Sequence, residues 1–230
     1  MSDDSAGLTA SNRTGIEPFV VLGSQSAGRL AVLGALLPAQ RIRVMPPENG
    51  EEPGFEGLAD IAAIEARIAL IARLKHVDVA RQVARLSVEE RSVCGGILTA
   101  DTVIVGTRSD GQSVVCGKPP ATPGLAEAVV RDWFVNLYAG RWHVAKTALC
   151  FSMPGANPIE QLVTTRVLFH PESAELVDWY LSTGEPFGKA GGYAIQGGGS
   201  LFVQGIDGSV SNVAGLPLWE TRNLLRSILP

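Results

Sequence analysis

The chain is poor in the side chains that build disulfide scaffolds and zinc sites. Its three cysteines (Cys94, Cys116 and Cys150) have no Cys-x-x-Cys spacing, and its three histidines form no pair at ligand spacing. An odd number of cysteines without such spacing is typical of reduced thiols, so we expect a cytoplasmic protein without a zinc site. No apolar run approaches the length of a membrane span, so we expect no membrane association.

Positive charge is also scarce. Lysine and arginine total 19 against 23 acidic residues, which gives a formal net charge of −4. Nucleic-acid binding needs a basic surface that displaces counterions, so this balance argues against it. Only four lysines occur, and Lys75, Lys118 and Lys189 lie in turns or near the end of a helical run. A few cations in an acidic protein favour a small phosphorylated ligand.

The length of 230 residues suits one domain, or one domain with two lobes. Residues 1–16 are polar and acidic, with neither a basic nor an apolar segment of the kind found in signal peptides. We therefore expect a disordered tail over 1–16 and a folded domain over 17–230.

Apolar periodicity predicts strands alternating with helices and some hairpins. The predicted strands are 19–22, 41–45, 96–105, 113–116, 143–151 and 161–169, with fragments at 194–195 and 201–203. A first helix is predicted to begin after a cap at Ser24 or Ser26. Further helices are predicted over 60–86, 125–138, 173–182, where Ser173 is the expected cap, and 217–228. This order indicates an α/β fold with a mixed, partly antiparallel sheet and flanking helices.

Two segments have the composition of ligand-binding turns. The stretch 184–217 is crowded with glycine and carries Lys189 and Gln196, and such glycine density favours turns or close backbone approach to a ligand. Ser24 and Arg29 flank the first predicted helix start, where free amides can bind an anion; the alternative is a simple helix cap. A cation such as Arg29 in the first turn opposes the helix dipole, which makes sense beside an anion.

Asp101 is the sharpest single candidate. It lies within the apolar run LTADTVIV, and a carboxylate buried there must be paired, hydrogen-bonded or bound to a cation. It is either a magnesium ligand or general base, or an acid that caps a turn. Glu51 or Glu52 could supply a second carboxylate. Lys75 could instead lie on a solvated helix face, and His143 is either catalytic or a hydrogen-bonded structural residue.

Together these segments resemble the Maf family of septum-formation-like nucleoside triphosphate pyrophosphatases. The matching blocks are LTADTVIV, CGKPP, AGRWHVAKTALCF and the run from YLSTGEPFGKAGGYAIQG through GSVSNVAGLPL. They follow one another in the family's order from about residue 19 to the end.

The resemblance implies two lobes around a nucleotide-binding cleft, as in inosine triphosphatases, and hydrolysis of a nucleoside triphosphate to the monophosphate and pyrophosphate. It implies a divalent cation, Mg²⁺ or Mn²⁺, and a possible homodimer. Asp101 matches the catalytic aspartate. Ser24, Arg29, Lys75, Lys118 and Lys189 match phosphate-binding positions, and Thr102 and Gln196 match positions linked to base selection in the branch that prefers dTTP and UTP.

Two positions depart from the family's pattern. Gly28 stands where an arginine linked to specificity is usual, and Gly188 stands where an aspartate often precedes the lysine. Substrate choice is therefore open between pyrimidine nucleotides and a purine alternative, 7-methyl-GTP or deaminated purine nucleotides. A further alternative is a non-catalytic nucleotide-binding regulator of cell division.

Overall fold

The computed structural model describes residues 18–229, and the expected tail at 1–16 lies outside these residues. The strands are β1 (Phe19–Leu22), β2 (Ile42–Val44), β3 (Cys94–Thr107), β4 (Ser113–Cys116), β5 (Trp142–Ser152), β6 (Ile159–Phe169) and β7 (Val203–Asp207). The α-helices are α1 (Ala27–Leu33), α2 (Ile61–Ala84), α3 (Val88–Ser92), α4 (Leu125–Trp133), α5 (Ser173–Ser182), α6 (Val210–Val213) and α7 (Leu218–Leu224). A π-helical turn (Phe134–Tyr138) extends α4, and the 3₁₀ turns are Ala39–Arg41, Ala190–Gly192 and Gly198–Phe202.

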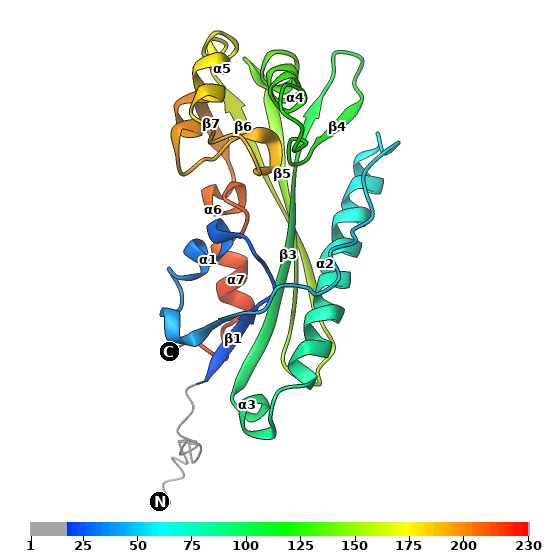
Figure 1. Ribbon diagram of the computed structural model, residues 1–230, viewed down its shortest axis with the longest axis vertical. Coiled ribbons are helices and arrows are strands. Elements are labelled where there is room, and N and C mark those ends of the chain that lie inside the picture. Colours follow the sequence, from blue (N-terminus) through cyan, green and yellow to red (C-terminus); the bar gives the residue numbers. More distant parts are fainter. Residues whose placement is uncertain (1–17, 230) are drawn as a thin grey trace, which may run out of the picture.

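The strands form one mixed sheet, which confirms the predicted fold class. The order is β2-β1-β3-β5-β6-β7, with β4 paired to β3 off this path. β1 is parallel to β2 and β3, whereas β4 and β5 are antiparallel to β3, and β6 and β7 continue the antiparallel pairing. The long strands β3, β5 and β6 run along the whole elongated molecule (Figure 1).

Helix α2 covers one face of this sheet. It begins at Asp60, whose carboxylate accepts the backbone N–H of Ala63. Apolar residues then recur every three or four positions, so one side of α2 is buried against β3 and β5. Ile64 and Ile68 pack there against Val103 and Ala148.

Two separate groups of helices cover the opposite face. Near one end, α1 and α7 pack on β1 and β3 through Leu33 and Leu225. Near the other end, α4, its π-helical extension and α5 enclose an aromatic cluster that includes Phe134, Tyr180 and Phe169. Figure 1 shows α6 between these two groups.

Several sequence-based boundaries need correction. Ser173 does not cap α5: the N-cap is Glu172, and the Ser173 hydroxyl is buried without a hydrogen-bond partner among the described residues. Residues 194–195 form no strand, and 198–202 form a 3₁₀ turn, so the strand predicted at 201–203 begins only at Val203. The glycines of this segment adopt irregular backbone conformations, so no regular strand forms where one was expected. The last helix ends at Leu224 instead of Ile228.

β3 has an open edge in its middle. β1 pairs with β3 only as far as Leu98, and β4 pairs with the same side of β3 only from Ile104 onward. At the usual rise per residue, the two pairing points are about 20 Å apart. Residues 99–103 therefore border a gap in the strand pairing on this side of β3.

Candidate functional site

The chain leaves both neighbouring strands at the gap beside residues 99–103. Ser24 follows the end of β1, and Lys118 follows the end of β4 at the opposite side of the gap. Because β1 and β4 run in opposite directions relative to β3, their carboxyl ends face each other across the opening. This topology explains why residues so distant in sequence border one site.

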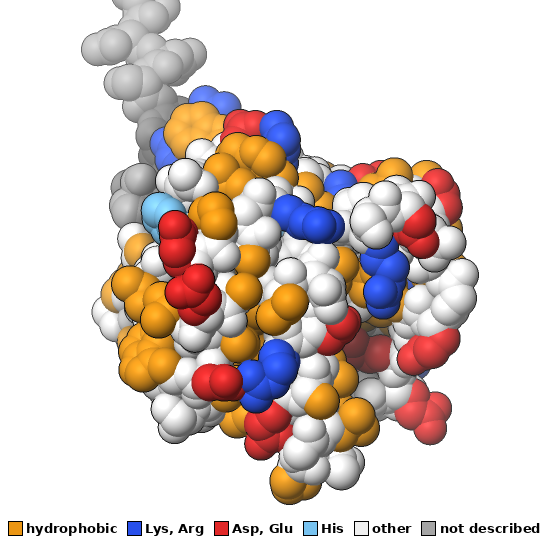
Figure 2. Space-filling model, turned by 90° about the horizontal axis from the view of Figure 1, so that it is seen from above, with side chains coloured by type: hydrophobic (Ala, Val, Ile, Leu, Met, Phe, Trp, Pro, Cys, Tyr) orange, Lys and Arg blue, Asp and Glu red, His pale blue; other side chains and the backbone are white. Residues whose placement is uncertain are grey.

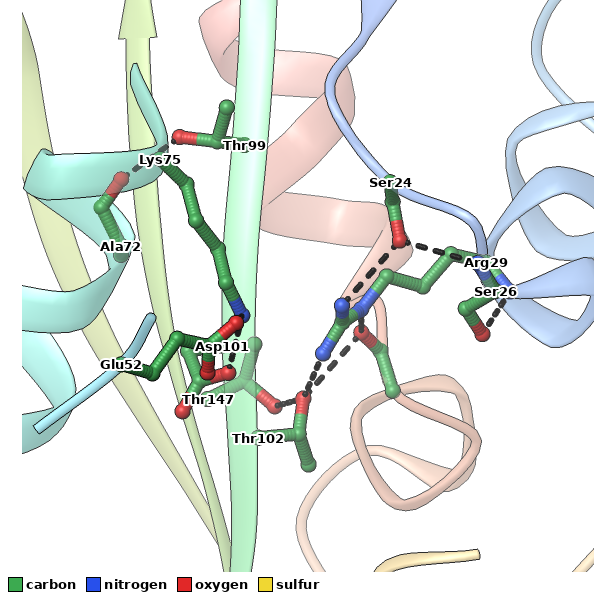
Figure 3. A network of polar contacts seen from close by, with 11 residues as sticks. Ser24, Ser26, Arg29, Glu52, Ala72, Lys75, Thr99, Asp101, Thr102 and Thr147 are labelled. Carbon is green, nitrogen blue, oxygen red and sulfur yellow. Dashed lines mark hydrogen bonds and ion pairs between the residues drawn. The ribbon is translucent and has the colours of Figure 1, made fainter. Parts of the chain in front are cut away.

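On the face of β3 that α2 covers, the ammonium group of Lys75 forms ion pairs with two carboxylates. Lys75 Nζ lies 2.7 Å from Asp101 Oδ1 and 3.0 Å from Glu52 Oε1 (Figure 3). The side chains of Lys75 and Asp101 are only 13% and 12% exposed, whereas Glu52 is 45% exposed. Lys75 is therefore not on a solvated helix face, and the alternative that Asp101 merely caps a turn is wrong. Burial of this kind requires pairing, as the sequence indicated.

Of the two candidate second carboxylates, only Glu52 contacts Lys75, the partner of Asp101. Glu51 is exposed, and its hydrogen bond is that of its backbone N–H to Asn49 Oδ1. The loop that carries both glutamates is fastened to α2 at a further point, where the backbone N–H groups of Glu48 and Asn49 donate to Asp78. These contacts set the loop along α2 with Glu52 at Lys75.

On the other face of β3, Arg29 lies in a frame of three oxygen atoms. Its Nε donates to the carbonyl of Gly215 at 2.9 Å, Nη1 donates to Ser24 Oγ at 3.3 Å, and Nη2 donates to Thr102 Oγ1 at 3.1 Å (Figure 3). Burial lowers the pKa of Arg29, and the nearby carboxylates of Asp101 and Glu52 oppose that shift. The helix start beside it is capped by Ser26, whose hydroxyl accepts the Arg29 N–H, rather than by Ser24.

Lys118, Lys189 and Gln196 are exposed, and the structure brings them no hydrogen bond or ion pair with Asp101 or Arg29. The turns that carry the two lysines are nevertheless joined, because the Gly191 N–H donates to the carbonyl of Gly117 at 3.0 Å. Figure 2 looks onto the end of the molecule with α4 and α5, where cationic groups stand apart among hydrophobic and acidic ones. The cations form no continuous basic face at this end.

The oxygen donors at the site suit a hard cation. Among residues 18–229 no three histidine, cysteine or acidic side chains lie together as a metal cluster. Mg²⁺, however, commonly binds through one or two carboxylates together with substrate phosphates and water. Asp101 and Glu52, which face the same ammonium group, fit that requirement.

His143 has a structural environment. It is buried, its Nε2 lies 3.0 Å from the Tyr193 hydroxyl, and its ring packs against Tyr138 and Phe169. Burial lowers its pKa to about 3, so the ring is neutral at physiological pH. No contact joins it to Asp101, which favours the structural interpretation of this residue.

Sequence reasoning missed two members of the network around Arg29. Thr147 Oγ1 on β5 lies 2.9 Å from Thr102 Oγ1, and Gly215 supplies a carbonyl to both Arg29 and Thr102. Thr147 lies directly opposite Thr102 in the β3–β5 ladder, a pairing that no spacing along the chain reveals. Gly215 has a φ of 102°, and this left-handed conformation explains why glycine occupies the turn.

A comparison with models of protein families shows to which family the chain belongs. The model of the family described as Maf-like protein matches residues 19–228. The chain belongs to the Maf family.

Several curated relatives of this Maf-family chain share the name dTTP/UTP pyrophosphatase. A dTTP/UTP pyrophosphatase of Anaeromyxobacter sp. (strain Fw109-5) is 38% identical over 211 residues, which cover 90% of this chain and 88% of the relative. One of Burkholderia pseudomallei (strain 1710b) is 34% identical over 91% of this chain and 93% of the relative. One of Neisseria meningitidis serogroup A is 39% identical over 132 residues, and there the aligned part of this chain spans only 60% of the relative's length.

Solved structures give a weaker likeness. A nucleoside-triphosphatase / dITP/XTP pyrophosphatase from Mycobacterium abscessus has a TM-score of 0.37 and 12% identity, covering 66% of the Maf-family chain and 74% of its own. A HAM1 protein from Coxiella burnetii has a TM-score of 0.36 and 13% identity, covering 67% and 74%. At this level the likeness carries no weight for function.

Proposed function

We propose that the chain hydrolyses nucleoside triphosphates, with dTTP and UTP as the preferred substrates, to the monophosphate and pyrophosphate. The observation that carries this proposal is the pair of groups on the two faces of β3: the Lys75–Asp101 ion pair on one and the framed Arg29 on the other. Both lie at the gap beside residues 99–103. The names of the curated relatives support the same activity and the same nucleotides.

In this reaction Asp101 accepts a proton from the attacking water. The water oxygen bonds to the α-phosphorus, the bond from that phosphorus to the bridging oxygen breaks, and pyrophosphate leaves with the electron pair. Lys75, 2.7 Å from Asp101, holds the carboxylate in place and adds positive charge. Cations aimed at the phosphates stabilise the negative charge that develops in the transition state.

The remaining candidate residues bind and orient the substrate. Ser24 borders one end of the gap, and Arg29 reaches Thr102 within it. The joined turns that carry Lys118 and Lys189 lie at the other end, so these cations are assigned to successive phosphates of the substrate. We assign Gln196 to the base. Thr102 contributes to base selection through the position of Arg29, with which its hydroxyl is already bonded.

A divalent cation, Mg²⁺ or Mn²⁺, belongs to this proposal, with Asp101 and Glu52 as its protein ligands. When bound, it neutralises phosphate charge and polarises the phosphoryl oxygens. We further propose that residues 17–230 act as one domain in the cytoplasm, as a homodimer, with no nucleic-acid partner. Among the described residues no helix has both the length and the apolar character needed to span a bilayer.

The test is a nucleotide panel. Protein and Mg²⁺ are incubated with dTTP, UTP, CTP, 7-methyl-GTP, ITP and XTP, and the products are separated by chromatography. Monophosphate plus pyrophosphate from dTTP and UTP is the expected result. Release of nucleoside diphosphate and orthophosphate would contradict the bond that we assign, and faster hydrolysis of the purine nucleotides would assign the chain to the purine alternative. Tight binding of dTTP without turnover would make the protein a regulator.

A further inference from the structure

The Thr102 hydroxyl has no capacity left for a substrate. A threonine hydroxyl donates one hydrogen bond and accepts two. Thr102 Oγ1 has three partners: it accepts from Arg29 Nη2 at 3.1 Å, lies 2.9 Å from Thr147 Oγ1, and donates to the Gly215 carbonyl at 3.3 Å. Because the Gly215 carbonyl oxygen can only accept, the Thr102 hydroxyl donates its one proton to it. The Thr102 oxygen therefore accepts the hydrogen bond from the Thr147 hydroxyl.

Thr147 is the group that fixes this arrangement. It is fully buried, and among the described residues Thr102 is the one hydrogen-bond partner of its hydroxyl. A buried hydroxyl without a partner is unfavourable, so Thr147 directs its proton to Thr102. Thr102 then presents its remaining acceptor site to Arg29.

Arg29 is held but not saturated. A guanidinium has five N–H donors, and three of them are used for Gly215, Ser24 and Thr102. The other two N–H groups, one on each terminal nitrogen, have no protein acceptor among residues 18–229. A planar group with two further donors suits the oxygens of a phosphate.

We propose that Thr147 is a positioning residue that orients Arg29 toward the substrate phosphates through the hydroxyl of Thr102. The role follows from the order of contacts from β5 through β3 to α1 (Figure 3). It rests on the proposed function for the identity of the ligand, a nucleoside triphosphate, and it concerns binding rather than proton transfer at Asp101.

The informative variant is Thr147→Val, which keeps the shape of the side chain and removes the hydroxyl. A misplaced charge-assisted contact is expected to raise the KM for dTTP about tenfold, while kcat stays within about twofold. Thr147→Ser restores the hydroxyl and should return KM to within about twofold of the wild-type value. Thr99→Val is the matched control: Thr99 is equally buried on β3, but its hydroxyl donates to the Ala72 carbonyl, away from Arg29.

Binding is measured as well, by calorimetry with α,β-methylene-dTTP and with pyrophosphate. We expect Thr147→Val to weaken both about tenfold in the wild-type background and to have no further effect when Arg29 is replaced by Ala. Thr102→Val should give the same loss, and it serves as the second route if Thr147→Val does not fold, as judged by its melting temperature.

Several results would overturn the proposal. They are unchanged affinity in Thr147→Val, an equal loss in Thr99→Val, no recovery in Thr147→Ser, or a full additional loss in the Arg29→Ala background. Because pyrophosphate binding needs no turnover, these results are separate from the nucleotide panel. A protein that binds pyrophosphate through this network but hydrolyses nothing would refute the proposed function and leave the role of Thr147 intact.

Discussion

The contribution of the Lys75–Asp101 ion pair to the free energy of unfolding can be measured directly. The two side chains are 13% and 12% exposed and their charged atoms are 2.7 Å apart, so little water screens them. In Lys75→Met the Asp101 carboxylate loses its partner. Removing one partner of a buried pair costs about 3–5 kcal/mol, and the residual exposure here places the expected loss near the lower limit, at about 3 kcal/mol.

The assay is thermal unfolding in buffer without divalent cations. For a domain of this size, about 3 kcal/mol corresponds to a fall in Tm of roughly 6–12 °C. Two further variants serve as controls. Glu52→Gln removes the more exposed carboxylate on the same lysine, at 45% exposure, and should cost under about 1 kcal/mol. The double variant Lys75→Met with Asp101→Asn has no isolated charge and should regain a large part of the loss.

A fall in Tm after Lys75→Met that is no larger than the fall after Glu52→Gln would contradict this expectation. A lack of recovery when Asp101→Asn is added to Lys75→Met would contradict it as well. In either case the ion pair would be effectively solvated, and its burial in the structure would have no energetic consequence.

Other changes have equally definite expectations. Asp101→Asn should abolish hydrolysis of dTTP but keep binding of α,β-methylene-dTTP within about threefold, and hydrolysis at the wild-type rate would remove Asp101 from its catalytic role. In Lys75→Met, Mg²⁺ should raise Tm more than in wild type, because two carboxylates then lack their ammonium group; an equal rise would argue against a cation at Asp101 and Glu52. Gly28→Arg should tighten triphosphate binding by roughly ten- to a hundredfold. There is room for the new side chain, because a Cβ at position 28 meets only ordinary contacts at 3.6 Å with Ser26 Oγ and the Ala214 carbonyl. Unchanged affinity would show that position 28 does not face the phosphates. The pKa of His143 is lowered from 6.5 to about 3, so the unfolded chain takes up a proton that the native chain refuses, and stability present above pH 6.5 is lost as the pH falls toward 3. Wild type should therefore lose about 2 kcal/mol more than His143→Phe between pH 7 and pH 5 in urea unfolding, and parallel curves would contradict this.

Much of the fold follows from local patterns in the sequence. The apolar period of α2 and the β-branched run of β3 predict these elements to within two residues at each end, because burial on one or both faces leaves a regular pattern in the sequence. The segment after α5 was predicted less well. There the conformation depends on positive φ angles at glycines such as Gly188 and Gly191 and on the carboxylate of Glu185, which accepts the backbone N–H groups of Gly198 and Gly199.

The candidate site was predictable in part. Asp101 stood out because a carboxylate in an apolar strand needs a partner, and Lys75 proved to be that partner. Choosing Glu52 over Glu51 required the path of the loop, which side-chain contacts to α2 determine. Thr147 could be recognised only from the strand register, since its meaning lies in the residue opposite to it rather than in its neighbours along the chain.

The strand pairing beside residues 99–103 also limits how the width of this gap can change. The strand that borders it, β3, pairs without interruption with β5 from Ile97 to Val105, and β5 pairs with β6 over the same region. The two sides of the opening are therefore parts of one hydrogen-bonded ribbon, so changing its width requires bending of that ribbon rather than rotation about a flexible linker. Amide protons on the paired side of β3 should accordingly exchange slowly with solvent whether or not a nucleotide is bound.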